Sequence, residues 1–280
     1  MEPKIILVPT DFTKVAQTAL NHSIKIARNA NATVNLLHVV HKSDMLPEAK
    51  EKLKIAKDRA KEDTGFEVDT TARVGTIFED IGDLAYELDA NMVVMGTHGL
   101  RGMQFLTGSR ALKIVTSADT PFIIVQEKEI GENGYDDIVV PLDLHKETKQ
   151  KLSLVANMSK YFDSRVHIIV PREKDEYLQN ALNRNLKYAE SFFDDLNIPH
   201  TSRISDRKSD DFDEAIIEYA NEIDADLISL MNLPGTSLAN LIGGNYVQNI
   251  ITNKHHIPVL LMNPKETGNI SIFSSYIGVG

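Results

Sequence analysis

Short apolar runs alternate with longer amphipathic stretches along most of the chain. The run over 5–9 is entirely apolar, which is typical of a strand buried on both faces of a parallel sheet. A helix is predicted to follow, because apolar residues recur there at spacings of four, four and three positions. These residues are Ala16, Leu20, Ile24 and Ala27. A second strand is predicted over 33–40.

The same alternation continues to residue 125. Residues 43–65 are charged and helix-permissive, with a thin apolar stripe formed by Leu53, Ile55 and Ala56. A further helix is predicted over 77–88. The remaining strands are predicted over 69–74, 92–95 and 121–125. Because strands alternate with helices, the connections are expected to be right-handed crossovers in a doubly wound parallel sheet.

The pattern then starts again, as an internal repeat would. Residues 138–143 repeat 6–11 at an offset of 132, and this offset holds as far as 166–170. Four later pairs match at an offset of 135: Ile216 with Ile81, Ala220 with Ala85, Ile223 with Leu88 and Asp224 with Asp89. The sequence therefore predicts an α/β fold of two tandem doubly wound domains, each a five-stranded parallel sheet flanked by helices.

The repeat also predicts the domain bounds. The first domain is expected over 1–130 and the second over 136–265, with Gly131–Gly134 as the linker. The C-terminal tail, 266–280, lies beyond the repeat. Its apolar residues suggest that it docks on a surface, which the sequence does not identify.

Composition agrees with two globular domains and excludes some partners. The chain has 280 residues, of which 42% are hydrophobic and 25% charged. Its net charge of −10 argues against non-specific binding to nucleic acid, which requires a basic face. Residues 1–135 carry 16 basic and 19 acidic side chains, whereas 136–280 carry 14 and 21. An anionic ligand is therefore better received by the first half.

The absence of cysteine, of a signal-peptide pattern and of long apolar runs limits the possible redox chemistry and location of the protein. There is no cysteine, so disulfides and thiolate metal sites are excluded. No signal-peptide pattern is present, and no apolar run reaches the roughly 18–20 residues that span a bilayer. We therefore expect a cytoplasmic protein without a membrane partner.

A glycine-rich loop follows the strand predicted over 92–95. Gly96, Gly99 and Gly108 let the backbone approach an anion closely, and Ser109 precedes a predicted helix. A helix N-terminus adds unpaired N–H donors and the positive end of the helix dipole. Strand, glycine loop and helix together form an arrangement that can hold phosphates, although glycine-rich turns also close ordinary strand–helix connections.

This loop resembles the ATP-binding signature of the universal stress protein family. The family pattern is Gly, two residues, Gly, about nine residues, then Gly followed by Ser or Thr. The chain has Gly96, Gly99 and Gly108-Ser109, with a spacer of eight residues, and His98 also matches. The resemblance implies an adenine-nucleotide alpha-hydrolase-like fold in which ATP lies at the carboxyl ends of the first, second and fourth strands.

The resemblance also implies which residues contact the nucleotide. Asp11 is expected to reach the ribose or adenine, Val39 to pack on adenine, and Ser109 to contact a phosphate while capping its helix. The complete set is Pro9, Thr10, Asp11, Val39, Met95, Gly96, His98, Gly99, Gly108, Ser109, Arg110 and Ala111. Structural alternatives stay open at four of these positions: Asp11 as a helix cap, Val39 as plain core, His98 as a surface turn residue and Arg110 as a solvated side chain.

The second copy departs from the signature. Asn232 stands where the first copy has Gly96, Pro234 stands where it has His98, and Gly244-Asn245 replaces Gly108-Ser109. Asn brings a side chain to a position of close approach, and Pro removes an N–H donor. We therefore expect one ATP per chain, in the first domain, with the second domain as a structural partner.

No catalytic or metal-binding motif is present. The phosphate-binding Gly-Lys-Ser/Thr motif, the His-Glu zinc helix and the Gly-x-Ser-x-Gly elbow are all missing, and the adjacent pair His255-His256 does not suit a metal. The leading hypothesis is an ATP-binding stress-response factor. The alternatives are a slow ATPase or adenylate-handling enzyme and a nucleotide-free dimeric scaffold. The sequence does not say whether Mg²⁺ accompanies the phosphates, and it names neither the stress nor the protein partner.

The last strand of each copy is expected to lie at a sheet edge. Residues 122–125 and 259–262 are apolar, and an exposed apolar edge promotes aggregation. Members of the family with a single domain dimerise along this edge. The resemblance therefore implies that the two domains pair through their last strands within one chain, and it leaves a homodimer open.

Overall fold

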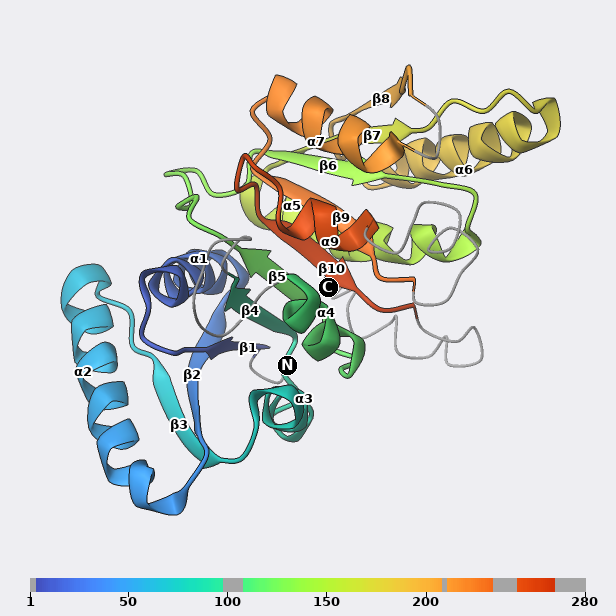
Figure 1. The fold of residues 1–280 in the computed structure, drawn as a ribbon. Coiled ribbons are helices and arrows are strands. Elements are labelled where there is room, and N and C mark those ends of the chain that lie inside the picture. Colours follow the sequence, from blue (N-terminus) through green and yellow to red (C-terminus); the bar gives the residue numbers. More distant parts are fainter. Residues whose placement is uncertain (1–3, 98–107, 208–210, 234–245, 265–280) are drawn as a thin grey trace. The chain divides into compact units, whose positions relative to one another are not determined.

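Two units make up the chain, Met1–Ile130 and Gly131–Gly280, in a computed structural model that describes residues 4–97, 108–207, 211–233 and 246–264 (Figure 1). The boundary falls within a few residues of the predicted linker. The predicted bounds of the second domain and its tail stay a prediction, because residues 265–280 are outside the described ranges.

The first unit alternates strands and helices as predicted. Its strands are β1 Lys4–Pro9, β2 Ala32–Val40, β3 Asp69–Val74, β4 Met92–Gly96 and β5 Phe122–Val125. Its helices are α1 Lys14–Ala30, η1 Ser43–Met45, α2 Leu46–Thr64, α3 Ile77–Glu87 and α4 Gly108–Thr116, η1 being a short 3₁₀ turn.

All strand pairs within this unit are parallel, in the order β3-β2-β1-β4-β5. The chain moves outward from β1 through β2 to β3, then returns to the other side of β1 for β4 and β5. The strand order therefore reverses between β1 and β4. In doubly wound sheets, ligands bind outside the carboxyl ends of the strands at such a point.

The second unit has the corresponding topology. Its strands are β6 Asp137–Pro141, β7 Arg165–Val170, β8 His200–Ile204, β9 Leu227–Met231 and β10 Val259–Met262. They are parallel in the order β10-β9-β6-β7-β8, so the reversal falls between β6 and β9. Its helices are η2 Lys146–Lys151, α5 Leu152–Phe162, α6 Glu176–Asp195, α7 Phe212–Glu222 and α9 Tyr246–Ile251. The predicted α/β class of two doubly wound five-stranded domains is confirmed.

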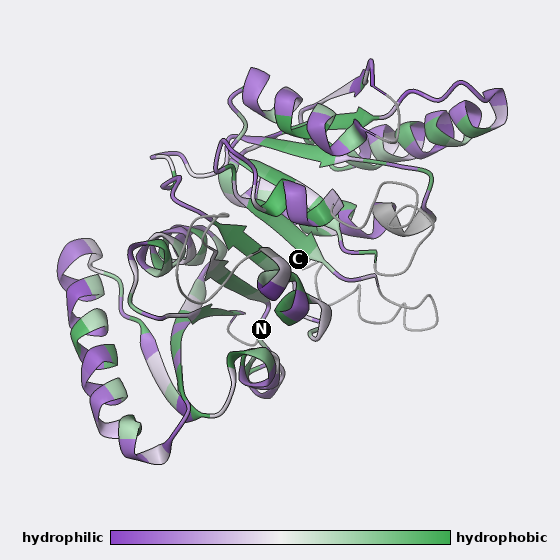
Figure 2. Ribbon diagram, viewed as in Figure 1, coloured by the Kyte–Doolittle hydropathy of each residue, from purple (hydrophilic) through white to green (hydrophobic). Residues whose placement is uncertain are grey.

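Apolar strands form the centre of each unit's core, as the green ribbons of Figure 2 show. The four helix residues predicted to face the sheet from α1 are all buried, the most exposed being Ala16 at 6%. The stripe predicted for α2 is wrong at Ile55, which is 59% exposed. The buried residues of α2 are Ala49, Leu53 and Ala60. Their spacings of four and seven follow the helical period, whereas residues two apart point to opposite sides.

Within the described part of the chain, no helix combines the length and the apolar character needed to cross a bilayer. The strands β4, β5, β6, β7, β9 and β10 are short and largely buried, whereas the edge strands β3 and β8 have no buried residue.

Candidate functional site

The carboxyl ends of β2, β1 and β4 lie side by side in the first unit. Pro9 of β1 is in register with Leu37 of β2, two residues before Val39, and β4 ends at Gly96 on the other side of β1. Met95 is fully buried, while Pro9 and Val39 are half-buried. The sheet order thus brings together six of the residues that the sequence singled out, Thr10 and Asp11 following directly after Pro9.

Asp11 is exposed and organises the turn that begins α1. Its Oδ1 accepts hydrogen bonds from the backbone N–H of Thr13 at 3.1 Å and from the Thr13 hydroxyl at 2.6 Å. Thr13 is the N-cap, and its own Oγ1 accepts from the N–H of Ala16 at 3.3 Å. The alternative that Asp11 itself caps the helix is therefore wrong. Asp11 holds the capping residue, and its second carboxylate oxygen has no protein donor among the described residues.

Thr10 is fixed from both sides of the turn. Its Oγ1 accepts from the N–H of Phe12 at 3.0 Å, and Nδ1 of His38 donates to its carbonyl oxygen at 2.7 Å. The Phe12 ring lies 4.6 Å from the His38 ring, centroid to centroid. Phe12 has a φ of 63°, a left-handed conformation that bulky residues rarely adopt. Such strain persists only where surrounding contacts impose it, and it clusters at functional sites.

Gly96 is required by the close approach of α1. A Cβ atom at this position would lie 2.6 Å from Cγ1 of Val15 and 2.9 Å from the backbone carbon and oxygen of the same residue. Because backbone atoms take part in this contact, a side-chain rotation cannot relieve it. The first glycine of the signature therefore allows the first turn of α1 to lie against the end of β4.

Helix α4 begins at Gly108, the last glycine of the signature. Ser109 and Arg110 are exposed in its first turn, and Ala111 is fully buried. The unpaired N–H groups of a first helical turn carry a partial positive charge that suits an anion. His98 and Gly99 lie outside the described residues.

A buried lysine occupies the corresponding end of the sheet in the second unit. Nζ of Lys151 donates to the carbonyl oxygen of Pro141, the last residue of β6, and the residue is 2% exposed. Burial lowers the pKa of Lys151 to about 8, with Asp143 opposing the shift. The offset of 132 makes Pro141 the counterpart of Pro9 and Lys151 that of Ala19. In this unit the carbonyl oxygen at the end of β6 is therefore already hydrogen-bonded to an ammonium group.

Asp143 lies near this lysine, and both Asp143 and Asp213 lie near Tyr246. Asp143 accepts from the N–H of His145 at 2.8 Å, and its carbonyl oxygen accepts from Nδ2 of Asn185 at 2.8 Å. Asp213 is 7% exposed and accepts from Nδ2 of Asn249 at 2.7 Å. Burial raises the pKa of the Tyr246 hydroxyl well above its ordinary value, and the charges of Asp143 and Asp213 raise it further.

The expectation that Asn232 stands at the position of Gly96 is wrong, because the strand register places Met231 there. Leu227 pairs with Ile138 as Met92 pairs with Ile6, and Met231 pairs with Met262 as Gly96 pairs with Val125. Asn232 follows Met231 directly and is buried. Its backbone N–H donates to the carbonyl oxygen of Met262, and its Nδ2 donates to Oδ1 of Asn263 at 2.7 Å. The helix after β6 also starts differently, because the 3₁₀ turn η2 replaces the first turns of an α-helix. Pro234, Gly244 and Asn245 are outside the described residues.

Several residues of these sites were not singled out by the sequence. His38 and Phe12 carry no motif, and their roles depend on contacts between the β1–α1 turn and the neighbouring strand. Lys151 could have been found by comparing the two copies, since a lysine replaces Ala19 at the same offset. Across the four described ranges, no three His, Asp or Glu side chains gather as a metal ion would require.

Comparisons with known proteins identify the family of this chain and agree with the fold described above. The universal stress protein family model matches residues 2–126. A universal stress protein of Methanocaldococcus jannaschii is 31% identical over 141 residues, which cover 44% of this chain and 82% of the relative. A second one from that organism is 28% identical over 157 residues, covering 45% and 96%. The solved structure of a universal stress protein from Archaeoglobus fulgidus matches with a TM-score of 0.72 at 16% identity, covering 94% of this chain and 97% of that chain, and it supports the fold.

Proposed function

Because the chain belongs to the universal stress protein family, we propose that its first unit binds one ATP molecule and that the protein acts as a nucleotide-dependent factor in a stress response. The observation that carries the proposal is the convergence at one edge of the sheet. The ends of β1, β2 and β4 lie side by side there, and α4 begins at the last glycine of the signature. This is the switch point at which doubly wound sheets bind ligands.

Roles in this proposal follow from the chemistry of each group. Asp11 keeps a carboxylate oxygen for ribose hydroxyls or an adenine amino group, and Val39 offers an apolar surface beside it. Gly96 leaves the end of β4 without a side chain, and Ser109 and Arg110 lie where the first turn of α4 attracts phosphates. His98 and Gly99 complete the phosphate contacts in the proposed site.

The second unit is proposed to bind no ATP. Nζ of Lys151 donates to the carbonyl oxygen at the end of β6, and Met231 brings a side chain to the position where the first unit needs glycine. The acidic excess of the second half also disfavours a polyanion. We therefore assign the nucleotide to the first unit alone.

The experiment is a titration of the purified full chain with ATP by calorimetry. We expect a stoichiometry near one. ATP binding should be abolished in Gly108→Val and unchanged in the matched variant Gly244→Val. A stoichiometry near two, or equal effects of the two variants, would contradict the assignment. Mass spectrometry of small molecules released on heat denaturation separates the competing functions. ATP supports the proposal, ADP or AMP favours a slow ATPase or an adenylate-handling enzyme, and no nucleotide favours a scaffold.

The proposal also includes the predicted pairing of the two units through their last strands. Strands β5 and β10 each consist of four buried apolar residues. Unpaired, such strands would be aggregation-prone edges. We expect Ile124→Lys to enlarge the radius of gyration in solution scattering, and an unchanged radius would contradict the pairing.

A further inference from the structure

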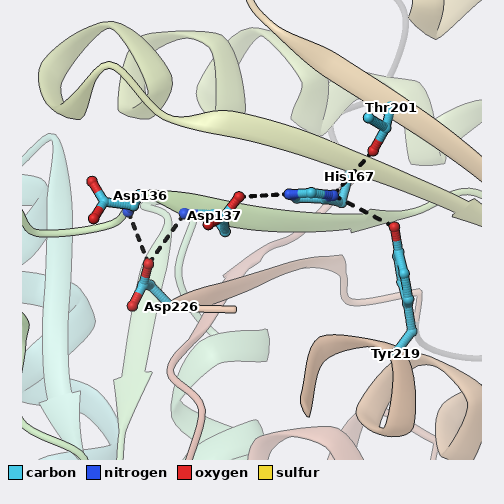
Figure 3. Close-up of polar contacts among 6 residues, drawn as sticks. All are labelled: Asp136, Asp137, His167, Thr201, Tyr219 and Asp226. Atoms are coloured by element: carbon cyan, nitrogen blue, oxygen red, sulfur yellow. Dashed lines mark hydrogen bonds and ion pairs between the residues drawn. The ribbon is translucent and has the colours of Figure 1, made fainter. Parts of the chain in front are cut away.

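A hydrogen-bonded chain of three side chains crosses the sheet of the second unit, away from the strand ends described above. His167 of β7 lies between Asp137 at the start of β6 and Thr201 of β8 (Figure 3). Its Nε2 is 2.6 Å from Oδ1 of Asp137, and its Nδ1 is 3.0 Å from the hydroxyl of Thr201. His167 is 7% exposed, whereas Thr201 is exposed.

The hydrogen-bond partners define which nitrogen carries the proton. A carboxylate oxygen only accepts, so Nε2 of His167 donates to Asp137. In neutral imidazole, Nδ1 then has a free lone pair and accepts the hydroxyl proton of Thr201. This is the protonation state that a general base requires. Asp137 is held in turn, because Oδ2 of Asp226 accepts the backbone N–H groups of Asp136 and Asp137 at 2.9 and 3.1 Å (Figure 3).

The fold does not require this chain of side chains. In the first unit, Asn35 has the strand register of His167, since Asn35 pairs with Leu7 and Asp69 as His167 pairs with Val139 and Thr201. The position of Asp137 is taken there by Ile5. Oδ1 of Asn35 is buried without a hydrogen-bond partner. The same strands are thus built without the carboxylate or the imidazole, which argues against a purely structural role.

We propose that Thr201 is an acyl-accepting nucleophile, with His167 as its general base and Asp137 as the residue that positions His167. A nucleophile within hydrogen-bond reach of a base, which a third group orients, is the arrangement that activates hydroxyl groups. The substrate class is an activated carboxylic ester. Oγ1 of Thr201 bonds to the carbonyl carbon while its proton passes to Nδ1 of His167. The bond from that carbon to the leaving oxygen breaks, and the imidazole gives the proton to the leaving oxygen. The products are an ester on Thr201 and the released alcohol.

The surroundings favour an acyl group over a phosphoryl group. The hydroxyl of Tyr219, from α7, lies 3.5 Å from Nδ1 of His167 and supplies a neutral donor for a carbonyl oxygen (Figure 3). The guanidinium of Arg203 lies 4.9 Å from the centre of the Tyr219 ring. Its charge is balanced by Glu222 at 2.8 Å.

The test uses p-nitrophenyl acetate and the full chain. Acetylation of Thr201 is expected to appear by mass spectrometry in the tryptic peptide 188–203, together with release of p-nitrophenolate. Thr201→Val should abolish this label and Thr201→Ser should retain it. His167→Asn, which installs the residue that the first unit has at this register, should slow labelling at least about 100-fold. The internal control is Thr70, an exposed threonine of β3 without an imidazole partner, which should stay unlabelled.

A second measurement separates catalysis from structure. The labelling rate of the unsubstituted protein should rise with pH, because a general base acts in its neutral form, and Asp137→Asn should lower the rate and change this dependence. Circular dichroism verifies that each variant is folded. Absence of acetyl-Thr201, equal labelling of Thr70, or a rate unchanged in folded His167→Asn would overturn the proposal. If His167→Asn does not fold, a pH-independent rate in the unsubstituted protein would overturn it instead.

Discussion

Nε2 of His22 donates a hydrogen bond to the carbonyl oxygen of Lys128 at 3.0 Å, joining α1 to the segment that follows β5. His22 is 1% exposed, and burial lowers its pKa from 6.5 to about 4. The folded protein therefore keeps this imidazole neutral over a range in which the unfolded chain protonates it.

Stability of the first unit is expected to fall as the pH is lowered from 6.5 towards 4. In this window the unfolded state binds one more proton at His22 than the folded state, so the free energy of unfolding decreases with decreasing pH. The loss approaches roughly 3 kcal/mol at pH 4, from 1.36 kcal/mol per pKa unit. Urea unfolding of His22→Gln, which keeps an N–H donor but does not titrate, is the control. An equal pH dependence in this variant would refute the assignment to His22.

Gly96→Ala is expected to destabilise the first unit by about 1–3 kcal/mol, because the added Cβ meets the backbone of Val15. The matched control is Gly82→Ala in α3, where the added Cβ has ordinary contacts, the nearest at 3.7 Å. This change should be neutral or stabilising by up to about 1 kcal/mol, since alanine favours the helix. Denaturant midpoints measure both. Equal effects of the two substitutions would argue against close approach as the reason for glycine at 96.

Much of the fold was predictable because buried parallel strands leave a strong pattern. The strands predicted over 92–95 and 121–125 lie within one residue of the bounds of β4 and β5, and the four apolar residues that mark α1 are all buried. The thin stripe of α2 was predicted less well. So few apolar residues occur there that Ile55, which is exposed, could be mistaken for a core position.

Contacts between elements were beyond the reach of sequence patterns. The interaction of His38 with Thr10 and Phe12 depends on how the β1–α1 turn folds over β2. The burial of Lys151 depends on the 3₁₀ turn η2. The charged sequence of this segment carries no pattern that predicts such a turn. The hydrogen bonds of His167 with Asp137 and Thr201 join three strands, and these residues are brought together only by the strand register.

Stability of the second unit is expected to rise between pH 8 and 9.5. The folded state releases the proton of Lys151 near pH 8, whereas the unfolded chain keeps it to about 10.5, so unfolding takes up a proton in this range. Above pH 10 the buried hydroxyl of Tyr135, whose pKa burial raises, opposes the trend. Lys151→Met should remove the rise, which denaturant unfolding at several pH values measures. A rise that persists in this variant would show that another group causes it.

ATP is expected to stabilise the first unit through Asp11. A ligand at 100-fold excess over its dissociation constant contributes about 2.7 kcal/mol to the free energy of unfolding. Asp11→Asn keeps an oxygen that accepts from Thr13, so the start of α1 should remain intact while the charge offered to the ribose or adenine is lost. The ATP-induced rise in melting temperature should therefore shrink in this variant. Asp143→Asn changes the corresponding residue of the second unit and should leave the rise intact. The assignment of the nucleotide to the end of β1 would be wrong if the ATP-induced rise in melting temperature were unchanged in Asp11→Asn. It would also be wrong if this rise were lost in Asp143→Asn.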